Sequence, residues 1–458
     1  MFPLFLRTLA RRLTSSRTAP RRPDFPRKRR LIVEPLECRS MMAAGALDPT
    51  FAGDGTVVTD ISGNRFDYIE DMALQSDGKI VVAGRHKSAS KGEEFALVRY
   101  NANGSLDGTF GSGGKVVTTF GTKDDGIMGI AFQSDGKIVA GGYTTVSNMR
   151  TFGLARYNVN GTLDSTFDGD GKLTTNVVSL SEGINDVVIQ PDGKIIAVGY
   201  AEVASGVSDF ALVRYNTNGS LDTSFGSGGK VTTSGTTNAD AVALQADGKI
   251  VVSGRANIGE GAIVRYNANG SLDTSFSGNG LLENALAESV RFSGVAIQSN
   301  GMIVTTDIYR EEVERWDASG NIDTTFAGDG SADVYSYTLY DVAMQADGKI
   351  LATGSGSGPS YGLLVFRFNV DGTRDATFGI AGIAEAEPGP INAAGVGKSV
   401  LVQPDGRIVA AGFQANGVPP WEYPNWNVLV ARFEGASTAG ALAALLFDDS
   451  LSPQKKKR

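Results

Sequence analysis

The chain has 458 residues, of which 41% are hydrophobic, 8% aromatic and 20% charged, with a formal net charge of -8. This composition supports a packed core and excludes an intrinsically disordered chain. The charge is uneven: residues 1–44 carry eleven basic and three acidic residues, the last four residues are basic, and the body between them keeps 27 basic and 47 acidic residues. An acidic body argues against a nucleic-acid partner. Cys38 is the single cysteine, so no disulfide can form within the chain.

Residues 1–46 form a basic leader, which we expect to be an export segment without fixed structure. It contains the run Arg27-Lys-Arg-Arg30 and lacks the unbroken apolar stretch of about 7 to 15 residues found in an ordinary signal peptide. The stretch Val33-Glu-Pro-Leu-Glu-Cys-Arg39 resembles the Leu-Glu-Pro-Arg-type leader of large exported planctomycete proteins, although arginine does not follow its proline. A disordered basic arm and an organellar transit peptide are the alternatives.

The body is an internal repeat with a period near 50 residues. The motif Gln-x-Asp-Gly-Lys-Ile, or a close variant, recurs at spacings of 58, 57, 55, 53, 47 and 58 residues, beginning at Gln75, Gln133, Gln190, Gln245, Gln298, Gln345 and Gln403. A period of this length is typical of a propeller or a solenoid. Residues that recur in every unit are therefore expected to build the unit rather than to act on a ligand.

Each unit reads as four short strands. In the first unit, Asp71–Gln75 and Lys79–Gly84 flank the turn signal Ser-Asp-Gly, and this pattern predicts a β-hairpin. A third apolar run at Phe95–Tyr100 and a fourth at Lys115–Phe120 complete the unit. Because no segment has a helical period, we expect four antiparallel strands, as in a propeller blade.

The order of the motifs predicts how the ring closes. The chain has seven hairpins, but it begins with a fourth strand and ends with a third one. If residues 47–60 pair with Asn427–Phe433, the first segment completes the last blade and leaves no long unpaired edge. The prediction is an all-β, seven-bladed β-propeller over residues 47–435, with a β-solenoid as the alternative.

The repeat resembles the delta-60 repeat family of bacterial β-propellers. That family carries a Leu-Asp-x-x-Phe-Gly start, a Gln-x-Asp-Gly-Lys-Ile centre and an Ala-x-x-Arg-Tyr-Asn end, and the resemblance covers residues 47–433. The fifth unit departs most, with Asn300, Met302, Trp316 and Asp317 at motif positions, and the seventh has Arg407 in place of lysine. The resemblance implies a propeller fold and assigns no activity.

The repeated polar motifs have a structural and a metal-binding interpretation. Asp77-Gly78 and its counterparts indicate type I′ hairpin turns, because glycine accepts a positive φ. The recurring Asn-x-Asn-Gly-x-x-Asp, as at Asn101, Asn103 and Asp107, offers oxygen groups that suit calcium, but Asn and Asp also make turns with their own backbone. We therefore predict no metal site and no cofactor, with calcium as the alternative.

The motif residues Arg99, Tyr100, Asp107 and Phe110 are predicted to be structural. Arginine and aspartate at fixed positions in each unit can form buried charge-assisted hydrogen bonds that lock the outer strands. Replacing them should destabilise the fold rather than remove one specific activity.

The inventory of catalytic groups is poor. His86 is the single histidine and lies in a segment that varies between units, so a zinc site with two histidines is excluded and a Ser-His-Asp triad would depend on this one residue. A pair of carboxylates remains possible, but no pair stands apart from the turn motifs. We predict that the protein is not an enzyme.

Sequence variation gathers in the connections that a propeller places on one face. These connections join the second strand to the third and the fourth strand to the next blade, and they include 86–94, 143–151, 201–209, 355–362 and 414–427. The last of them holds Trp421, Tyr423 and Trp426 on a proline-rich loop, which suits sugar stacking or a protein contact. The alternative is that these rings plug the mouth of the channel or cover the closing blade.

We therefore expect a non-enzymatic exported propeller that acts as a binding or scaffold module at the cell envelope or outside the cell. Its expected partner is a carbohydrate or a protein at the cell surface. A carbohydrate-active enzyme, a hydrolase or lyase using carboxylates in the central pocket, is the alternative, and a purely structural surface protein is a third reading. Residues 436–458 are expected to be a tail, either a short helix or disordered. Its apolar run from Ala439 to Phe447 is too short to span a bilayer.

Overall fold

The structure is a computed structural model that describes residues 43–436, except 62, 64–65, 89–91, 122, 179, 257–258, 285–289, 336, 357–361, 388–394 and 416–425. The predicted tail after residue 436 and all but the last four residues of the predicted leader lie outside the described residues. The described chain contains strands and turns and no helix, and the strands form seven four-stranded antiparallel sheets. The seven-bladed all-β prediction is confirmed.

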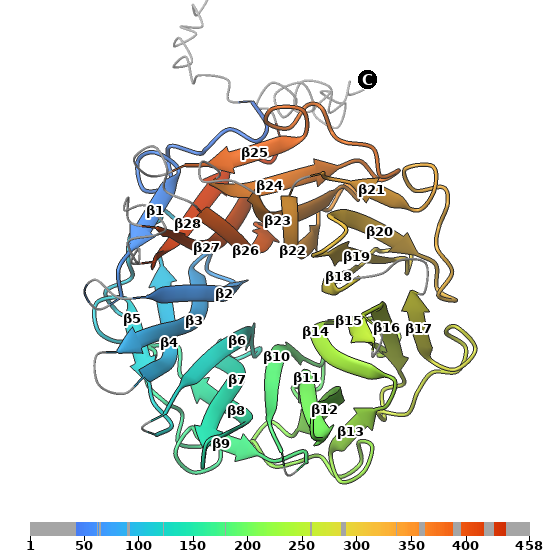
Figure 1. Cartoon of the computed structure of the whole chain (residues 1–458). Helices are drawn as coiled ribbons and strands as arrows, with labels where there is room; N and C mark the ends of the chain where they lie inside the picture. The colour runs from blue at the N-terminus through green and yellow to red at the C-terminus, as the bar shows by residue number, and fades with distance from the viewer. Residues whose placement is uncertain are drawn as a thin grey trace, which may run out of the picture. The chain divides into compact units, whose positions relative to one another are not determined.

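The first strand of every blade lies nearest the ring axis (Figure 1). These seven innermost strands are β2 (Asp67–Leu74), β6 (Asp125–Phe132), β10 (Glu182–Ile189), β14 (Thr236–Leu244), β18 (Phe292–Ile297), β22 (Tyr337–Met344) and β26 (Gly395–Val402). The second strands are β3 (Ile80–Ser88), β7 (Ile138–Val146), β11 (Ile195–Ala204), β15 (Ile250–Ala256), β19 (Ile303–Asp307), β23 (Ile350–Gly356) and β27 (Ile408–Ala415).

The third and fourth strands continue each blade outward. The third strands are β4 (Gly92–Tyr100), β8 (Met149–Tyr157), β12 (Val207–Tyr215), β16 (Gly261–Tyr266), β20 (Glu312–Trp316), β24 (Leu363–Phe368) and β28 (Trp426–Phe433). The fourth strands are β5 (Lys115–Thr118), β9 (Lys172–Thr175), β13 (Lys230–Thr233), β17 (Leu281–Asn284), β21 (Ser331–Asp333), β25 (Ile383–Ala386) and, in the last blade, β1 (Thr56–Thr59). Blades one to seven are numbered here from β2, β6, β10, β14, β18, β22 and β26.

The ring closes as the motif order predicts. β1 pairs with β28 in the order β1-β28-β27-β26, with Thr56 opposite Ala431 and Thr59 opposite Val428. A further bridge joins Leu47 to Phe433. The described chain begins packing at Ala44, which is buried between blades six and seven. The last blade is therefore built from both ends of the propeller sequence.

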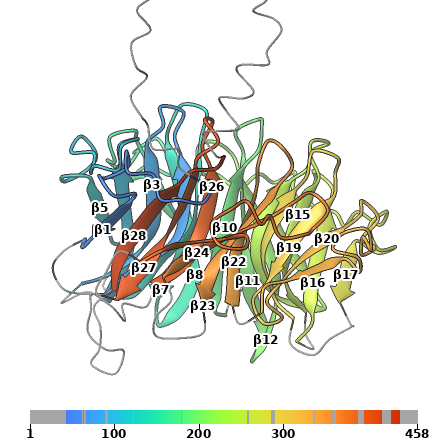
Figure 2. The same cartoon turned by 90° about the horizontal axis from the view of Figure 1, so that it is seen from above.

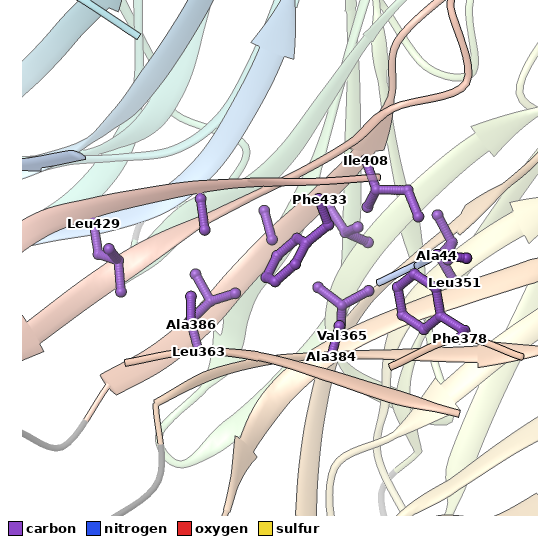
Figure 3. Close-up of a cluster of buried hydrophobic side chains, with 13 residues drawn as sticks. Ala44, Leu351, Leu363, Val365, Phe378, Ala384, Ala386, Ile408, Leu429 and Phe433 are labelled. Atoms are coloured by element: carbon purple, nitrogen blue, oxygen red, sulfur yellow. The ribbon is translucent and has the colours of Figure 1, made fainter. Parts of the chain in front are cut away.

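Apolar layers between neighbouring blades form the core. Each of the seven interfaces has its own cluster of buried side chains, contributed by strands of the two blades, the innermost ones included. Figure 3 shows the layer between blades six and seven, where Phe378, Leu351 and Ala44 lie together. Because both faces of the middle strands are covered, their sequences are continuous apolar runs such as Ile80-Val-Val-Ala83.

A clasp around a buried arginine joins each blade to the next. In blade one, Arg99 Nε donates to Asp107 Oδ2 at 2.9 Å, and its guanidinium carbon lies 4.4 Å from the centre of the Phe110 ring. Its Nη1 donates to the carbonyl of Val159 in blade two. All seven blades repeat this clasp, with the arginines Arg99, Arg156, Arg214, Arg265, Arg315, Arg367 and Arg432. The motif residues thus make buried contacts within and between blades, and their predicted structural role stays a prediction.

The predicted type I′ turn at Asp77-Gly78 is wrong. Gly78 has a φ of +83°, whereas Asp77 is absent from the described residues with positive φ, and type I′ needs both. The Gly78 amide donates to Gln75 O and the Gln75 amide to Lys79 O, which defines a three-residue loop with a type I turn followed by a left-handed glycine. This loop needs only one residue of positive φ, so Ser76 and Asp77 keep ordinary backbone angles.

The Asn-Gly loops use their side-chain oxygens in local turns. Asn103 Oδ1 accepts from the amide and hydroxyl of Ser105, and Asp107 Oδ1 accepts from the amide and hydroxyl of Thr109. These hydrogen bonds favour the turn interpretation of the motif.

The connections gather at the two ends of the sheets (Figure 2). The motif face holds the Asp-Gly turns and the Asn-Gly loops. The variable face holds the connections between second and third strands and those from a fourth strand to the next blade. In the part of the chain described here, no helix has the length and apolarity needed to cross a membrane.

Asp48→Ala should destabilise the closed ring strongly. Asp48 Oδ2 accepts from Arg432 Nε at 2.8 Å, and both side chains are buried, so the substitution leaves the guanidinium without its counter-charge. We expect the free energy of unfolding to fall by about 3 kcal/mol in urea denaturation. The matched control is Asp54→Ala, which removes an exposed carboxylate bonded to Thr56 and should change stability by less than about 0.5 kcal/mol. Equal effects of the two substitutions would contradict a closing role for the clasp.

Candidate functional site

Every innermost strand carries a β-bulge at the same place. The pairing register of the first and second strands shifts five residues before the motif glutamine in all seven blades. A bulge leaves one residue out of the ladder and redirects its side chain. The bulged residues differ in every blade, and they are Glu70, Met128, Asn185, Asp240, Ser293, Tyr340 and Lys398.

These seven side chains line one pocket on the ring axis, which we call the axial pocket. It has a volume of about 220 Å³, and Arg291 and Ile308 complete its lining. Arg291 precedes β18 and Ile308 follows β19, so both belong to connections of the variable face. The axial pocket therefore lies toward the variable face, and its volume suits a ligand smaller than the drug-sized molecules that occupy about 300–1,000 Å³.

Larger hollows elsewhere are lined mainly by repeated motifs. One of about 840 Å³ lies between blades four and five over two hairpin turns that contain Asp247 and Asn300. Another of about 690 Å³ lies beside β1 and the Asn103–Leu106 loop. Because the lining residues belong to turn motifs that recur in every blade, these hollows have few side chains that could make a specific site. The axial pocket is the better candidate because its seven bulged side chains are all different.

An ion-pair network occupies one side of the axial pocket. Glu70 Oε2 lies 3.3 Å from Lys398 Nζ, and Glu70 Oε1 lies 3.3 Å from an Arg85 nitrogen. Lys398 Nζ also lies 4.1 Å from the centre of the Tyr340 ring, which is a cation–π contact. One carboxylate thus joins blades one and seven and is neutralised by two cations.

A second network occupies the side formed by blades three to five. Arg291 binds Asp240 through two hydrogen bonds of 2.7 and 2.6 Å, and Asn238 Nδ2 donates to the same carboxylate. Asn185 Nδ2 donates to Asn238 Oδ1 at 3.0 Å and to the Ala239 carbonyl at 2.7 Å. Burial raises the pKa of Asp240, against the opposing effect of Arg291. The fork of Arg291 fixes this carboxylate in one orientation.

Three half-buried aspartates lie next to bulged residues. In each, one oxygen accepts an amide of its own strand and the other accepts an amide of the following blade: Ile130 for Asp71, Val242 for Asp186 and Val400 for Asp341. Burial raises the pKa of Asp71 to about 6 and that of Asp341 to about 7, and it raises the pKa of Asp186 well above its ordinary value. These carboxyl groups tie the inner strands of neighbouring blades together.

Of the three aromatic residues predicted to bind a ligand, the structure describes Trp426, whereas Trp421 and Tyr423 lie outside the described residues. Trp426 packs edge-on against Phe413 at 5.2 Å, and Phe413 packs edge-on against Tyr68 at 5.1 Å. Arg85 lies over the Tyr68 ring and pairs with Glu70. Trp426 is outside the lining of the axial pocket and is connected to it through this row of rings.

His86 is placed differently from the prediction. It was expected in a variable loop, but it lies within β3, is 3% exposed, and its Nδ1 is 2.6 Å from Asp67 Oδ1. Asp67 Oδ2 accepts from the Ile61 amide, so the pair anchors the chain that enters β2. The hairpin thus extends further than its apolar pattern indicates, and Asp67 gives His86 a buried partner within it.

The sequence analysis missed the bulged residues. The sequence does show that the residue five positions before the motif glutamine differs in chemical type between repeats. It does not show that a bulge lies there, because a bulge does not change the alternation of apolar residues. Within the described residues, no group of three or more His, Cys, Asp or Glu side chains is arranged to hold a metal ion.

Five segments match the model of a family described as "Domain of unknown function (DUF5122) beta-propeller": residues 75–110, 133–167, 190–225, 245–276 and 345–378. They fall in blades one, two, three, four and six, and the two blades without a match are those whose motifs depart from the repeat. The chain is thus a seven-bladed β-propeller whose repeats are consistent with a propeller repeat family. Comparison with curated proteins gave no match.

Solved propellers resemble the chain only distantly. Virginiamycin B lyase from Staphylococcus aureus is 12% identical, with a TM-score of 0.47, and the match covers 82% of this chain and 98% of that one. A protein of unknown function from Dyadobacter fermentans is 11% identical, with a TM-score of 0.44 and coverage of 83% and 99%. An aldose sugar dehydrogenase from Streptomyces coelicolor is 15% identical, with a TM-score of 0.42 and coverage of 70% and 94%. At these values the matches carry no argument about activity.

Asp71 and Asp341 should make the protein less stable as the pH rises. Their pKa values in the folded state lie above the unfolded value of about 3.9, so the folded protein binds more protons between about pH 4 and pH 7, and this stabilisation is lost as the pH rises through 6 to 7. From these two groups we expect the free energy of unfolding in urea to fall by roughly 4 kcal/mol between pH 5 and pH 8.

Asp71→Asn and Asp341→Asn should each flatten this dependence. The clasp aspartates do not contribute to the change in stability between pH 5 and pH 8. Against the effect of burial, hydrogen bonds and Arg156 lower the pKa of Asp164 to about 2, so this group affects stability only below about pH 4. The same pH slope in both variants as in the unmodified protein would refute the assignment.

Proposed function

We propose that the protein is a non-enzymatic binding module that holds a small polar ligand in the axial pocket. The observation that carries the proposal is the convergence of seven different bulged side chains at one point of an otherwise repetitive ring. Fold stability explains residues that recur in every blade, but it does not explain why the bulged position changes in each. A binding site explains both the variation and its location.

The chemistry of the axial pocket favours a neutral, hydroxyl-rich ligand such as a sugar unit. Its cations and carboxylates are paired with each other in the networks of Glu70 and Asp240, so a ligand does not need to carry a charge to neutralise them. Asn185, Ser293 and Tyr340 add neutral hydrogen-bonding groups, and Met128 and Ile308 add apolar surface. A concave site with a few polar groups among apolar ones is typical of small-molecule recognition.

The enzyme alternative rests on the presence of Glu70 and Asp240 in the same pocket. A glycosidase needs two carboxyl groups, one of them protonated to act as an acid. Here Arg85 and Lys398 pair with Glu70, and Arg291 forms two hydrogen bonds with Asp240, so both carboxylates are already engaged by side chains of the protein. These pairings support a binding role over acid catalysis.

We further propose that the module acts at the cell envelope or outside the cell, on a carbohydrate or a protein that carries one. The acidic body and the basic leader support export. The aromatic row from Tyr68 to Trp426 beside the axial pocket would extend the contact surface for a longer chain of sugars.

Ligand binding should depend on the axial pocket. The full-length protein is screened by thermal shift against monosaccharides, cell-wall disaccharides and free amino acids, and hits are measured by calorimetry. The double variant Glu70→Gln, Lys398→Met removes an ion pair with little change of shape, and we expect roughly tenfold weaker binding or more. Asp135→Asn, Lys137→Met is the matched control, because it removes an ion pair from an exposed turn on the motif face.

Three outcomes would decide between the readings. Equal affinity of both double variants for every hit would overturn the axial pocket as the site. Loss of binding in Trp426→Ala alone would move the site to the aromatic loop. Release of a cleaved product from a hit, abolished by Asp240→Asn, would favour the enzyme alternative.

A further inference from the structure

Blade five departs from the other blades at two core positions of its third strand. One and three residues before the clasp arginine, the other blades have small or apolar residues, namely Val98 and Ala96, Ala155 and Gly153, Val213 and Ala211, Val264 and Ala262, Phe366 and Leu364, and Ala431 and Leu429. Blade five has Glu314 and Glu312. Its second strand also ends at Asp307, where every other blade has a glycine whose Cβ would meet a carbonyl oxygen at 2.0 Å or less.

The three carboxylates lie together at the interface with blade four. Asp307 is opposite Glu312 in the pairing of β19 with β20, and the positions of Glu312 and Glu314 are those that face the preceding blade elsewhere in the ring. Asp307 is fully buried, Glu314 is 2% exposed and Glu312 is 8% exposed. An apolar layer in six blades is thus replaced by buried acid in one.

The available positive charge does not balance this acid. Arg310 reaches Glu312 at 3.1 Å and Glu314 at 3.3 Å, and Asp307 Oδ1 accepts the backbone amides of Tyr309 and Arg310. Within the described residues, Glu314 Oε2 and Asp307 Oδ2 are buried without a hydrogen-bond partner. A buried carboxylate oxygen without a partner costs free energy, so a fold that keeps one in place of valine needs a reason other than stability.

A cleft opens at Glu314. It has a volume of about 470 Å³ and lies between the outer strands of blades four and five. Leu282, Trp316 and Ile322 give it an apolar wall, and the exposed Glu283 and Asp329 stand with Arg310 in its lining. The lining of the cleft therefore combines apolar side chains, two exposed carboxylates and the buried Glu314, whose Oε2 has no hydrogen-bond partner among the described residues.

We propose that this cleft binds an organic cation, a primary ammonium group on an aliphatic chain, with the ammonium at Glu314 and the chain along Trp316 and Leu282. An ammonium group supplies the hydrogen-bond donors that Glu314 Oε2 lacks. The apolar wall suits methylene groups, and the Trp316 ring favours a nearby cation. A metal ion is the weaker choice, because no cluster of three or more metal-ligating side chains is arranged for one in the described part of the chain.

The protonation of Glu314 gives the proposal a distinctive signature. Burial, with Asp307 and Glu312 nearby, raises the pKa of Glu314 to about 8. The charged groups around it are Asp307 on β19, Glu312 on β20, Arg310 on the connecting loop, Glu283 on β17 and Asp329. An arriving ammonium favours the ionised carboxylate, so binding below pH 8 expels a proton, and the apparent affinity should rise with pH up to about 8.

The test is calorimetry of the full-length protein with n-pentylamine, and with pentan-1-ol as the neutral probe of equal length. We expect the amine to bind and the alcohol not to bind. Binding should be roughly tenfold weaker or more in Glu314→Gln, with loss of the pH dependence, and weaker by a smaller factor in Glu283→Gln, an exposed position that cannot disturb folding. Glu314→Val restores the residue of blades one, three and four, so it should fold, melt at a higher temperature and lose amine binding.

Three results would overturn the proposal. One is the absence of amine binding by the folded protein between pH 6 and pH 9. Another is equal affinity of Glu314→Gln and the unmodified protein. The third is binding of Ca²⁺ alone that excludes the amine, because it would assign the cleft to a metal ion.

Discussion

The buried arginine clasp is the interaction on which the ring depends. Each clasp joins an arginine, an aspartate and a phenylalanine of one blade, and it reaches a carbonyl of the next blade. In the last blade, Asp48 and Arg432 are 384 residues apart in the chain, so the same contact that fixes a blade also closes the ring. A charge buried at every interface leaves little tolerance for misplaced blades, because each guanidinium needs its carboxylate.

A rigid ring allows its inner surface to vary. The apolar layers and clasps fix the backbone of each blade, and the bulge then points one side chain per blade toward the axis without further demands on its type. Glutamate, methionine, asparagine, aspartate, serine, tyrosine and lysine all occupy this position. The interface between blades four and five differs, because there the variation lies in the core itself. Burying the carboxylate of Glu314 costs free energy at a position that accepts valine, which favours a binding role for this residue.

The sequence predicts the scaffold better than the site. Seven repeats, four strands in each and closure by β1 follow from motif order and apolar runs, because these features depend on local pattern. The hairpin loop at Asp77 was assigned to the wrong turn type, since one glycine of positive φ fits two kinds of loop. The bulges at Glu70 and its counterparts escaped prediction because they depend on pairing between strands. Asp307 and Glu312 are placed opposite each other only by the pairing of β19 with β20.

The most direct test of the axial pocket as a binding site is a crystal structure of the full-length protein soaked in a cocktail of monosaccharides. We expect ordered ligand density in the axial pocket, within hydrogen-bond distance of at least two of Glu70, Asn185, Asp240, Ser293, Tyr340 and Lys398. Ligand density confined to the repeated turns of the motif face, with the axial pocket holding solvent alone, would contradict it.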